Sequence, residues 1–586
     1  MALKEYHNIK DLPINELKEY SDDIANFLAQ ETRFDIDTIV KNINVLETTL
    51  ALHYVFDLSY DRVLFDGGNQ VLVHKILTGR IDELLLRTNA PVNLSNDNPY
   101  DAYTGGGIGE SLGAALSYTD KRNGRTIVVI DDHALNYGVT YEGLVDISRH
   151  NPDLTIILID EQQSLLRHHT SLDVLVKSIR ISKTYSTLKK DVRNILDSNP
   201  ISRPIYKSLV RMRNAVKESV LEPTIFTQFG IDYQGPIDGQ SLPDLIRVLE
   251  LSKTLKGPHV IHVQTRLRSN ARRNLDFPKF KTDDATPKNY TSYHEVFDRV
   301  LTGMRDPKLL VLVDAISFGD YFKEFESNYP NNYIVSTGAT GSLIAAASSY
   351  IKQGYRVVLA LSSTRILDAI SALEHQFVLN DLPLTLLVRH AGLSSHSNRF
   401  DHGIFDIKAL NAISNIYNPS NLSDAEKTLQ RVLSEEGIKV VRYQNNSEMY
   451  KPSTSYRGES WSVIQEFSNT SKAIIITTGA STEVFLSRIK SNDLDVGLIH
   501  ARLMNDIDHE VLNSVIESGC PIFIYNIESD TDTMTPMIIK YLYTKQKYVP
   551  IQSFNLEGIS YEDGSRILKR KNELQVDDVF NKILEG

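Results

Sequence analysis

The chain has 586 residues and a composition typical of a globular protein, with 41% hydrophobic and 23% charged residues. At roughly 100–200 residues per domain, this length predicts about three domains. The net charge of −11 argues against a nucleic-acid-binding protein, because a phosphate backbone needs a basic face. The single cysteine, Cys520, excludes an intrachain disulfide and is expected to be a buried structural thiol.

The sequence shows no sign of export or of membrane insertion. The N-terminal stretch MALKEYHNIKDL lacks the apolar core of a signal peptide. No apolar run approaches the ~20 residues that a helix needs to cross a bilayer. We therefore expect a cytoplasmic protein without a membrane partner.

Short, nearly all-apolar runs recur along the chain, separated by segments long enough for crossover helices. Such runs are typical of parallel strands that are covered on both faces. The pattern predicts an α/β protein with three doubly wound domains and mainly parallel sheets. The clearest runs are Thr126–Ile130, Leu154–Ile159, Val260–Val263, Leu309–Val313, Arg356–Leu361, Leu384–Val388, Ala473–Thr477, Val496–His500 and Ile522–Tyr525.

Two polar, turn-rich stretches are typical of linkers, at residues 266–290 and 444–460. They predict domains at residues 1–275, 290–445 and 455–586. The stretch 165–225 is more polar and is expected to be a helical excursion within the first domain.

Four segments carry a family resemblance. They are the opening LPINELKEYSDDIANFL, the stretch Glu47 to Arg80 with its motif HKILTGR, FGIDYQGPIDG with its GPIDG turn, and VGLIHARLMNDIDHEVL from Val496 to Leu512. In this order and spacing, the chain resembles the 1-deoxy-D-xylulose-5-phosphate synthase family, which is transketolase-like and belongs to the thiamine-diphosphate superfamily. The resemblance covers essentially the whole chain.

The resemblance implies an architecture and a reaction. The first domain would hold the diphosphate of thiamine diphosphate with Mg²⁺, the second would hold its aminopyrimidine, and the smaller third would be structural. The family forms homodimers and condenses pyruvate with glyceraldehyde 3-phosphate, releasing CO₂. The product feeds isoprenoid, thiamine and pyridoxal synthesis. A small metabolite and a second copy of the chain are the partners that this implies.

The resemblance also assigns a metal site and a cofactor loop. In the superfamily, a Gly-Asp-Gly turn and a later Asn hold the metal, and the matching ligands here are Asp132 and Glu161. The alternative is an acidic cluster that faces water. A glycine-rich loop before a helix presents backbone amides to an anion, although Glu110 at the helix start would repel a phosphate. The cofactor-binding candidates are Gly105, Gly106, Gly107, His133 and Ala134.

The family's catalytic histidines are largely replaced. Three of their positions hold Thr38, Asn69 and Gly107, and the fourth matches Asp401 or, with a one-residue slip, His402. Asp401 and His402 are therefore the catalytic candidates. Threonine and asparagine side chains position a substrate, but they do not shuttle protons near neutral pH.

The glutamate that activates the cofactor is also missing from its expected place. Its position matches Thr340, and no carboxylate occurs between Ser336 and Tyr350. A hydroxyl cannot replace a carboxyl as a proton donor to a ring nitrogen. The family's substrate-phosphate arginine, a helix tyrosine and a cofactor-packing aromatic match Asn445, Ile370 and Arg365.

Three hypotheses follow from these residues. The hypothesis that we favour is a non-catalytic relative that keeps the dimeric fold and acts as a scaffold or metabolite-binding regulator. Alternatively, it is an active thiamine-diphosphate transferase with an altered mechanism. A third hypothesis is different chemistry in the old cleft, using Asp132, Glu161 or the histidines His390, His396 and His402, although spacing by six residues matches no standard metal motif.

Overall fold

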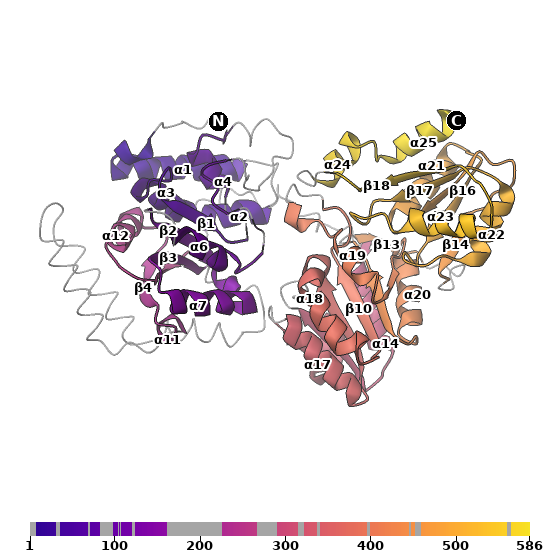
Figure 1. Cartoon of the computed structure of the whole chain (residues 1–586), viewed down its shortest axis with the longest axis horizontal. Coiled ribbons are helices and arrows are strands. Elements are labelled where there is room, and N and C mark those ends of the chain that lie inside the picture. Colours follow the sequence, from indigo (N-terminus) through magenta and orange to yellow (C-terminus); the bar gives the residue numbers. More distant parts are fainter. Residues whose placement is uncertain are drawn as a thin grey trace, which may run out of the picture. The chain divides into compact units, whose positions relative to one another are not determined.

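A computed structural model divides the chain into two compact units, residues 1–281 and 282–586, and each is described by itself (Figure 1). No helix among the described residues is long and apolar enough to span a membrane. The structure describes residues 8–30, 36–67, 71–81, 98–103, 105, 107–119, 124–160, 225–265, 290–314, 321–336, 340–394, 399–444, 447–451, 459–559 and 564–585.

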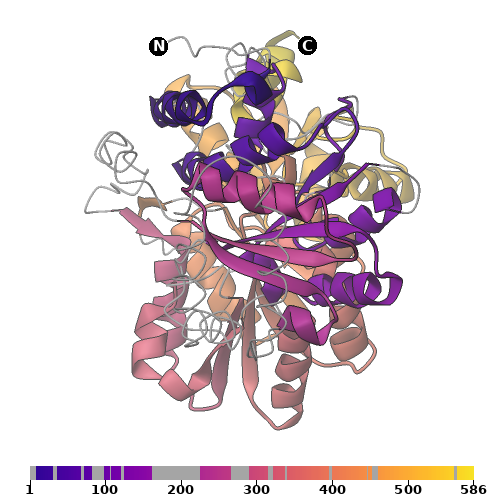
Figure 2. The same cartoon turned by 90° about the vertical axis from the view of Figure 1, so that its left-hand side faces the viewer.

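The first unit contains one five-stranded parallel sheet. Alternate strand residues point to opposite faces, so Val63 and Phe65 join one hydrophobic cluster and Leu64 joins the other. Helices cover both faces of the sheet, as Figures 1 and 2 show. The strand order is β1 (Arg62–Phe65), β2 (Thr126–Asp131), β3 (Leu154–Asp160), β5 (His259–Gln264) and β4 (Asp232–Asp238). One face packs on α1 (Ile14–Gln30), α2 (Ile36–Asn44), α3 (Leu46–Val55), α4 (Leu72–Leu77) and α12 (Leu242–Ser252), and the other on α6 (Ser111–Thr119), α7 (Gly138–His150) and α11 (Ile225–Gln228).

The second unit contains a six-stranded parallel sheet, again covered on both faces. Its order is β11 (Asn415–Tyr417), β12 (Ile438–Arg442), β10 (Leu384–Arg389), β9 (Arg356–Ser362), β7 (Leu309–Asp314) and β8 (Tyr333–Ser336). One face packs on α14 (Tyr293–Gly303), α16 (Lys323–Asn328) and α20 (Leu422–Val432). The other packs on α17 (Thr340–Lys352), α18 (Ile366–Leu373) and α19 (Asp406–Leu410).

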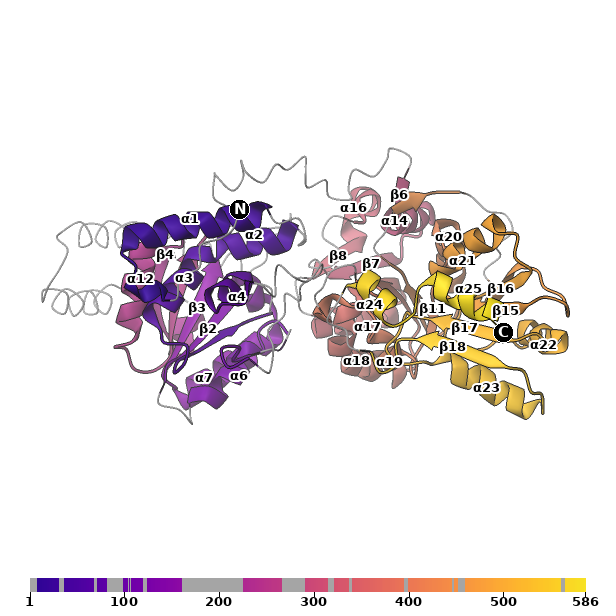
Figure 3. The same cartoon turned by 90° about the horizontal axis from the view of Figure 1, so that it is seen from above.

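A five-stranded sheet completes the second unit, and its edge strand β14 pairs antiparallel with β16. Figure 3 shows the other four strands, β15 to β18, from above. Its order is β14 (Trp461–Gln465), β16 (Val496–Ala501), β15 (Ala473–Thr477), β17 (Ile522–Asn526) and β18 (Ile551–Asn555). Its helices are α21 (Ser481–Ser491), α22 (His509–Ser518), α23 (Met534–Thr544), α24 (Ser565–Lys571) and α25 (Val576–Glu585). The α/β class with three mainly parallel sheets is therefore confirmed.

The predicted strands lie where the apolar runs predicted them, with ends that differ by at most one residue. The extra residue is usually polar, as at Asp131, Asp160 and Arg389, because each strand runs on to the edge of its sheet. The GPIDG segment was expected to be a turn, but it lies largely in β4, whose register shifts between Gln234 and Ile237. Residues 447–449 of the second predicted linker form strand β13 (Ser447–Met449), paired with β6 (Tyr290–Ser292). The domain boundaries themselves stay a prediction, and the excursion at 165–225 lies outside the described residues.

A fully buried arginine joins the two sheets of the second unit. Arg442, at the end of β12, binds Asp406 through Nε at 2.8 Å and Glu528 through Nη1 at 3.0 Å. It also donates to the carbonyl oxygens of Gly403 and Glu528. Burial opposes the charge, but the two carboxylates more than offset it and raise the pKa of Arg442. This network holds α19 and the segment after β17 to β12.

Replacing Arg442 with leucine leaves Asp406 and Glu528 as buried carboxylates without their cation. We expect the free energy of unfolding to fall by about 3–5 kcal/mol, measured by urea denaturation. The control is Arg488→Ala, which removes an exposed 2.6 Å pair with Asp577. It should cost less than about 1 kcal/mol. Equal losses in the two variants would contradict a structural role for the buried network.

A second buried network surrounds Asp424. Arg502 Nε donates to Asp424 at 2.6 Å, and His500 Nδ1 lies 3.4 Å from the same carboxylate. His500 Nε2 donates to the carbonyl of Asn418 at 3.1 Å, so the ring proton is on Nε2. Burial lowers the pKa of His500 to about 4, although Asp424 acts in the opposite direction. The folded protein therefore holds this ring neutral.

The His500 pKa predicts a loss of stability in acid. In the unfolded chain the ring titrates near its ordinary value of about 6.5, so below that pH the unfolded state binds the proton first. The stabilisation present above pH ~6.5 is lost as the pH falls towards about 4, by about 3 kcal/mol. We expect His500→Gln to lose less stability than the wild type between pH 7.5 and pH 4.5, measured by urea denaturation. The same loss in both proteins would exclude His500 as the group responsible.

Candidate active site

Polar side chains gather where the strands of the first sheet end. Asp66 directly follows β1. Asp131 is the last residue of β2 and Asp132 follows it, and Asp160 is the last residue of β3. The carboxyl ends of parallel strands meet at one edge, which is where ligands bind in open α/β sheets. This edge is therefore the candidate site of the first unit, and carboxylates dominate it.

Asp66 already uses the backbone amides of the glycine-rich loop. Its carboxylate accepts from the N–H of Gly109 at 2.7 Å and of Ser111 at 3.3 Å, at the start of α6. Gly109 has φ +86°, a conformation that favours glycine. Burial raises the pKa of Asp66, and the hydrogen bonds from Ser111 and Gly109 limit the rise. In anion-binding loops, such backbone amides donate to a bound anion. Here they donate to the carboxylate of Asp66, a side chain of the same chain.

Glu110 and Tyr103 occupy the space beside Gly105 and Gly107. A Cβ at Gly107 would lie 2.0 Å from Cδ of Glu110, and a Cβ at Gly105 would lie 2.3 Å from the Tyr103 hydroxyl. The Tyr103 hydroxyl donates to Glu110 Oε2 at 3.3 Å. Burial and then the Glu110 charge raise the pKa of Tyr103, so its proton remains in place. Gly106 lies outside the described residues.

The predicted metal residues are placed only in part. Asp132 and His133 are half-buried and open the 3₁₀ turn Asp132–Asn136, and Ala134 in the same turn is buried. Glu161 lies outside the described residues, so the Asp132–Glu161 pair stays a prediction. Within the described part of the chain, no group of three or more His, Cys, Asp or Glu side chains could hold a metal ion.

A buried chain of three polar side chains crosses this sheet, and sequence reasoning missed it. His262 Nε2 lies 3.1 Å from Asp160 Oδ2, and the Tyr233 hydroxyl lies 2.5 Å from His262 Nδ1. Since a carboxylate only accepts, Nε2 carries the proton and Nδ1 accepts from the tyrosine. The sequence signal was a histidine inside an otherwise apolar strand, but its partners come from two other strands.

The HKILTGR motif forms a second buried relay. Arg80 binds Asp101 with both terminal nitrogens, at 2.7 and 2.8 Å, and His74 Nε2 lies 3.2 Å from the same carboxylate. His53 Nε2 lies 3.0 Å from His74 Nδ1. Because the arginine keeps Asp101 ionised, the carboxylate accepts from His74, whose Nδ1 in turn accepts from His53. Burial lowers the pKa of both histidines, so the relay is neutral.

In the second unit, Thr340 and Arg365 meet at the carboxyl edge of the six-stranded sheet. Thr340 begins α17 and is 6% exposed, and Arg365 lies between β9 and α18. Arg365 Nη2 donates to the Thr340 hydroxyl at 3.1 Å, and its Nη1 pairs with Asp368 at 2.8 Å. A permanent cation therefore contacts Thr340, the position that the family resemblance predicts for the activating glutamate.

The histidines of residues 390–402 have separate surroundings. His402 is 1% exposed, and its Nδ1 accepts from the N–H of Ser394 at 3.0 Å. Asp401 is exposed. His390 has φ +58° and its Nδ1 lies 3.4 Å from the Ser362 hydroxyl. His396 lies outside the described residues, so a three-histidine centre stays a prediction.

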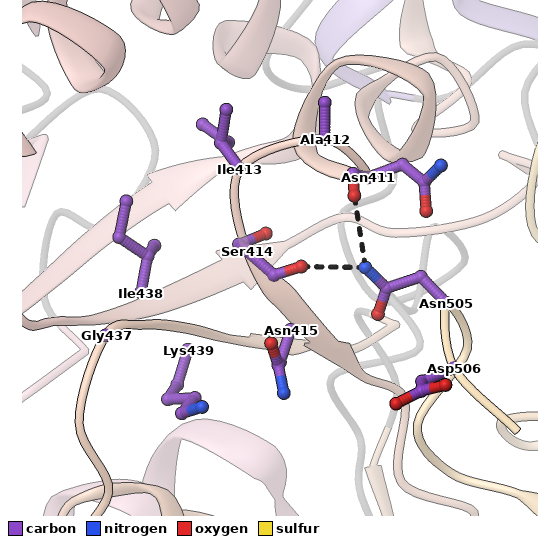
Figure 4. A pocket seen from close by; sticks show the side chains of 10 residues that line it. All are labelled: Asn411, Ala412, Ile413, Ser414, Asn415, Gly437, Ile438, Lys439, Asn505 and Asp506. Carbon is purple, nitrogen blue, oxygen red and sulfur yellow. Dashed lines mark hydrogen bonds between the residues drawn. The ribbon is translucent and has the colours of Figure 1, made fainter. Parts of the chain in front are cut away.

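A pocket of about 420 Å³ lies at the six-stranded sheet of the second unit (Figure 4). Asn415 and Ile438, the first residues of β11 and β12, line it, so it is at the amino ends of these strands. Asn505 donates to the carbonyls of Ser414 and Asn411 at 2.7 and 3.3 Å, and accepts from the N–H of Ile416. These bonds tie a loop to the sheet, away from the carboxyl edge.

Comparisons with known proteins agree with the sequence motifs. Residues 1–265 match the family model for 1-deoxy-D-xylulose-5-phosphate synthase. The enzyme of that name from Clostridium tetani is 28% identical over 88% of this chain and 87% of its own length. That of Clostridium perfringens strain 13 is 26% identical over 98% of each chain.

Solved transketolases align along the chain at low identity. Transketolase from Leishmania mexicana is 13% identical, with a TM-score of 0.41, over 98% of this chain and 97% of that one. A split-gene transketolase described as an inactive β4 tetramer is 15% identical, with a TM-score of 0.44, over 50% of this chain and 97% of its own.

The three mainly parallel sheets define an α/β fold. With a family model that matches residues 1–265 and relatives at 26–28% identity over most of the chain, the protein is similar to the 1-deoxy-D-xylulose-5-phosphate synthases.

Replacing Asp66 with alanine removes the acceptor at the start of α6. We expect the amides of Gly109 and Ser111 to lose hydrogen-exchange protection worth about 1–2 kcal/mol, as for other helix caps. Asp66→Asn is the control, because its side-chain oxygen still accepts from Gly109. Unchanged exchange in the alanine variant would show that Asp66 does not hold the loop.

Proposed function

We propose that this chain is a non-catalytic member of its family that keeps the fold and acts as a scaffold or metabolite-binding regulator. The contact between Arg365 and Thr340 is the observation that supports this most directly. Thiamine catalysis needs a carboxyl to protonate the aminopyrimidine ring, and a threonine hydroxyl does not supply that proton. A guanidinium beside it disfavours a further positive charge on the ring.

The carboxyl edge of the first sheet supports the same proposal. The Asp66 carboxylate accepts from the loop amides, and the Glu110 carboxylate fills the space over Gly107. The Asp66 carboxyl is buried and the Glu110 carboxyl is exposed, and a diphosphate placed there would meet like charge where they are ionised. The described residues therefore do not fit thiamine diphosphate.

The expected loss of rate is large. Each missing acid or base costs ~10²–10⁴ in rate, and the losses need not add. With Thr340 at the glutamate position and Thr38, Asn69 and Gly107 at histidine positions, we propose that the condensation of pyruvate with glyceraldehyde 3-phosphate does not proceed at a useful rate. We also propose that the chain forms a homodimer in the cytoplasm, with a small metabolite rather than thiamine diphosphate and Mg²⁺ as its ligand.

Calorimetric titration of the full chain with thiamine diphosphate and Mg²⁺ tests the proposal. We expect no saturable heat and no shift of a cooperative thermal transition. A bound ligand at ~100 times its Kd would stabilise the fold by ~2.7 kcal/mol, which is readily seen. Saturable binding together with pyruvate consumption would overturn the proposal and favour a transferase with an altered mechanism.

A matched variant shows where the chemistry is blocked. Thr340→Glu combined with Arg365→Phe restores the family's residue types at the aminopyrimidine end and leaves the diphosphate end unchanged. Because Asp66 and Glu110 remain, we expect this variant to bind thiamine diphosphate no better than the wild type. Binding gained by the double variant would place the whole obstacle at Arg365 and Thr340.

A further inference from the structure

A cavity of about 370 Å³ lies beside α24 in the second unit. Its volume is in the range of small-molecule sites. The described lining residues are Ser565, Arg566 and Lys569 of α24 and Gln575 just before α25. Figure 3 shows these two helices beside the C-terminal sheet. The lining therefore has two cations and two neutral polar side chains, with no carboxylate among its described members.

Neither cation of this cavity has a protein partner in the described part of the chain. Lys569 and Arg566 make no hydrogen bond or ion pair there, whereas other cations at this end, such as Arg488 and Lys582, pair with Asp577 and Glu585. Arg566 is exposed and Lys569 is half-buried. A partly buried ammonium without a partner carries a desolvation cost, and a bound anion would offset that cost.

The carboxylate that acts on Lys569 does not supply the missing partner. Burial lowers the pKa of Lys569, and Glu528 is the carboxylate that acts against this. Glu528 is already engaged, since Arg442 Nη1 binds it at 3.0 Å and Gln444 Nε2 lies 3.3 Å from its other oxygen. This carboxylate therefore belongs to the buried network and does not pair with the lysine.

We propose that this cavity binds a small phosphate-bearing anion, with Lys569 and Arg566 supplying charge and Ser565 and Gln575 supplying hydrogen bonds. Two cations with neutral donors are the residue types that recognise a phosphate group. Inorganic phosphate and a phosphate monoester share this chemistry. The site gives the chain a ligand other than thiamine diphosphate.

The cavity is also linked to the loop after β10. The N–H of Ser565 donates to the carbonyl of Ser394 at 2.7 Å, and the N–H of Ser394 donates to His402. An anion held by α24 would therefore steady the segment that contains His402.

Calorimetric titration of the full chain with inorganic phosphate and with glycerol 3-phosphate, without thiamine diphosphate or Mg²⁺, tests this site. We expect saturable binding near physiological ionic strength, where long-range surface attraction is screened. Lys569→Gln and Arg566→Gln should each weaken it at least tenfold. Tighter binding of the ester would identify a phosphorylated metabolite as the ligand class, and equal binding would identify free phosphate.

Arg570→Gln is the matched control, because it removes one charge from the same helix at an exposed residue outside the cavity. It should leave the affinity unchanged, and thermal melts should show all three variants folded. No binding by the wild type, or an equal loss in the Arg570 variant, would overturn the proposal. Either result leaves the thiamine-diphosphate titration unaffected, so the two proposals fail separately.

Discussion

The central constraint on this protein is that its parallel strands are buried on both faces. Helices cover each face, so strand interiors are almost wholly apolar and polar residues are displaced to the strand ends. Asp131, Asp160 and Arg389 are all last residues of strands. The same packing that makes the core therefore also gathers the charges that decide what the protein can bind.

Other groups of the same chain contact the charged side chains at these edges. In the first unit, Asp66 takes the amides of the glycine-rich loop, and Glu110 with Tyr103 fills the space beside the glycines. In the second, Arg365 reaches Thr340. Carboxylates therefore occupy the candidate anion site of the first unit, and a guanidinium lies at the carboxyl edge of the six-stranded sheet in the second.

The sequence predicted the strands well because burial on both faces leaves an unbroken apolar run, as in Leu154–Asp160. Short edge strands such as β11 were missed, since three residues give no period to detect. The Tyr233–His262–Asp160 chain was also missed, because it depends on the spatial order of β4, β5 and β3. The glycine-rich loop was correctly placed before a helix, but pattern alone could not show that Asp66, some forty residues earlier, would occupy its amides.

Buried ionic networks stabilise the fold independently of the residues at the candidate site. Arg442 and Arg502 are fully buried, and removing either leaves an uncompensated carboxylate, whatever happens in the cleft. These networks tie the two sheets of the second unit together through Glu528 and Asp424. Lys569 differs from both arginines, since Glu528, the carboxylate that opposes the lowering of its pKa by burial, is already paired with Arg442. Among the described residues, a half-buried cation that lines a cavity and has no partner in the chain points to a partner from outside it.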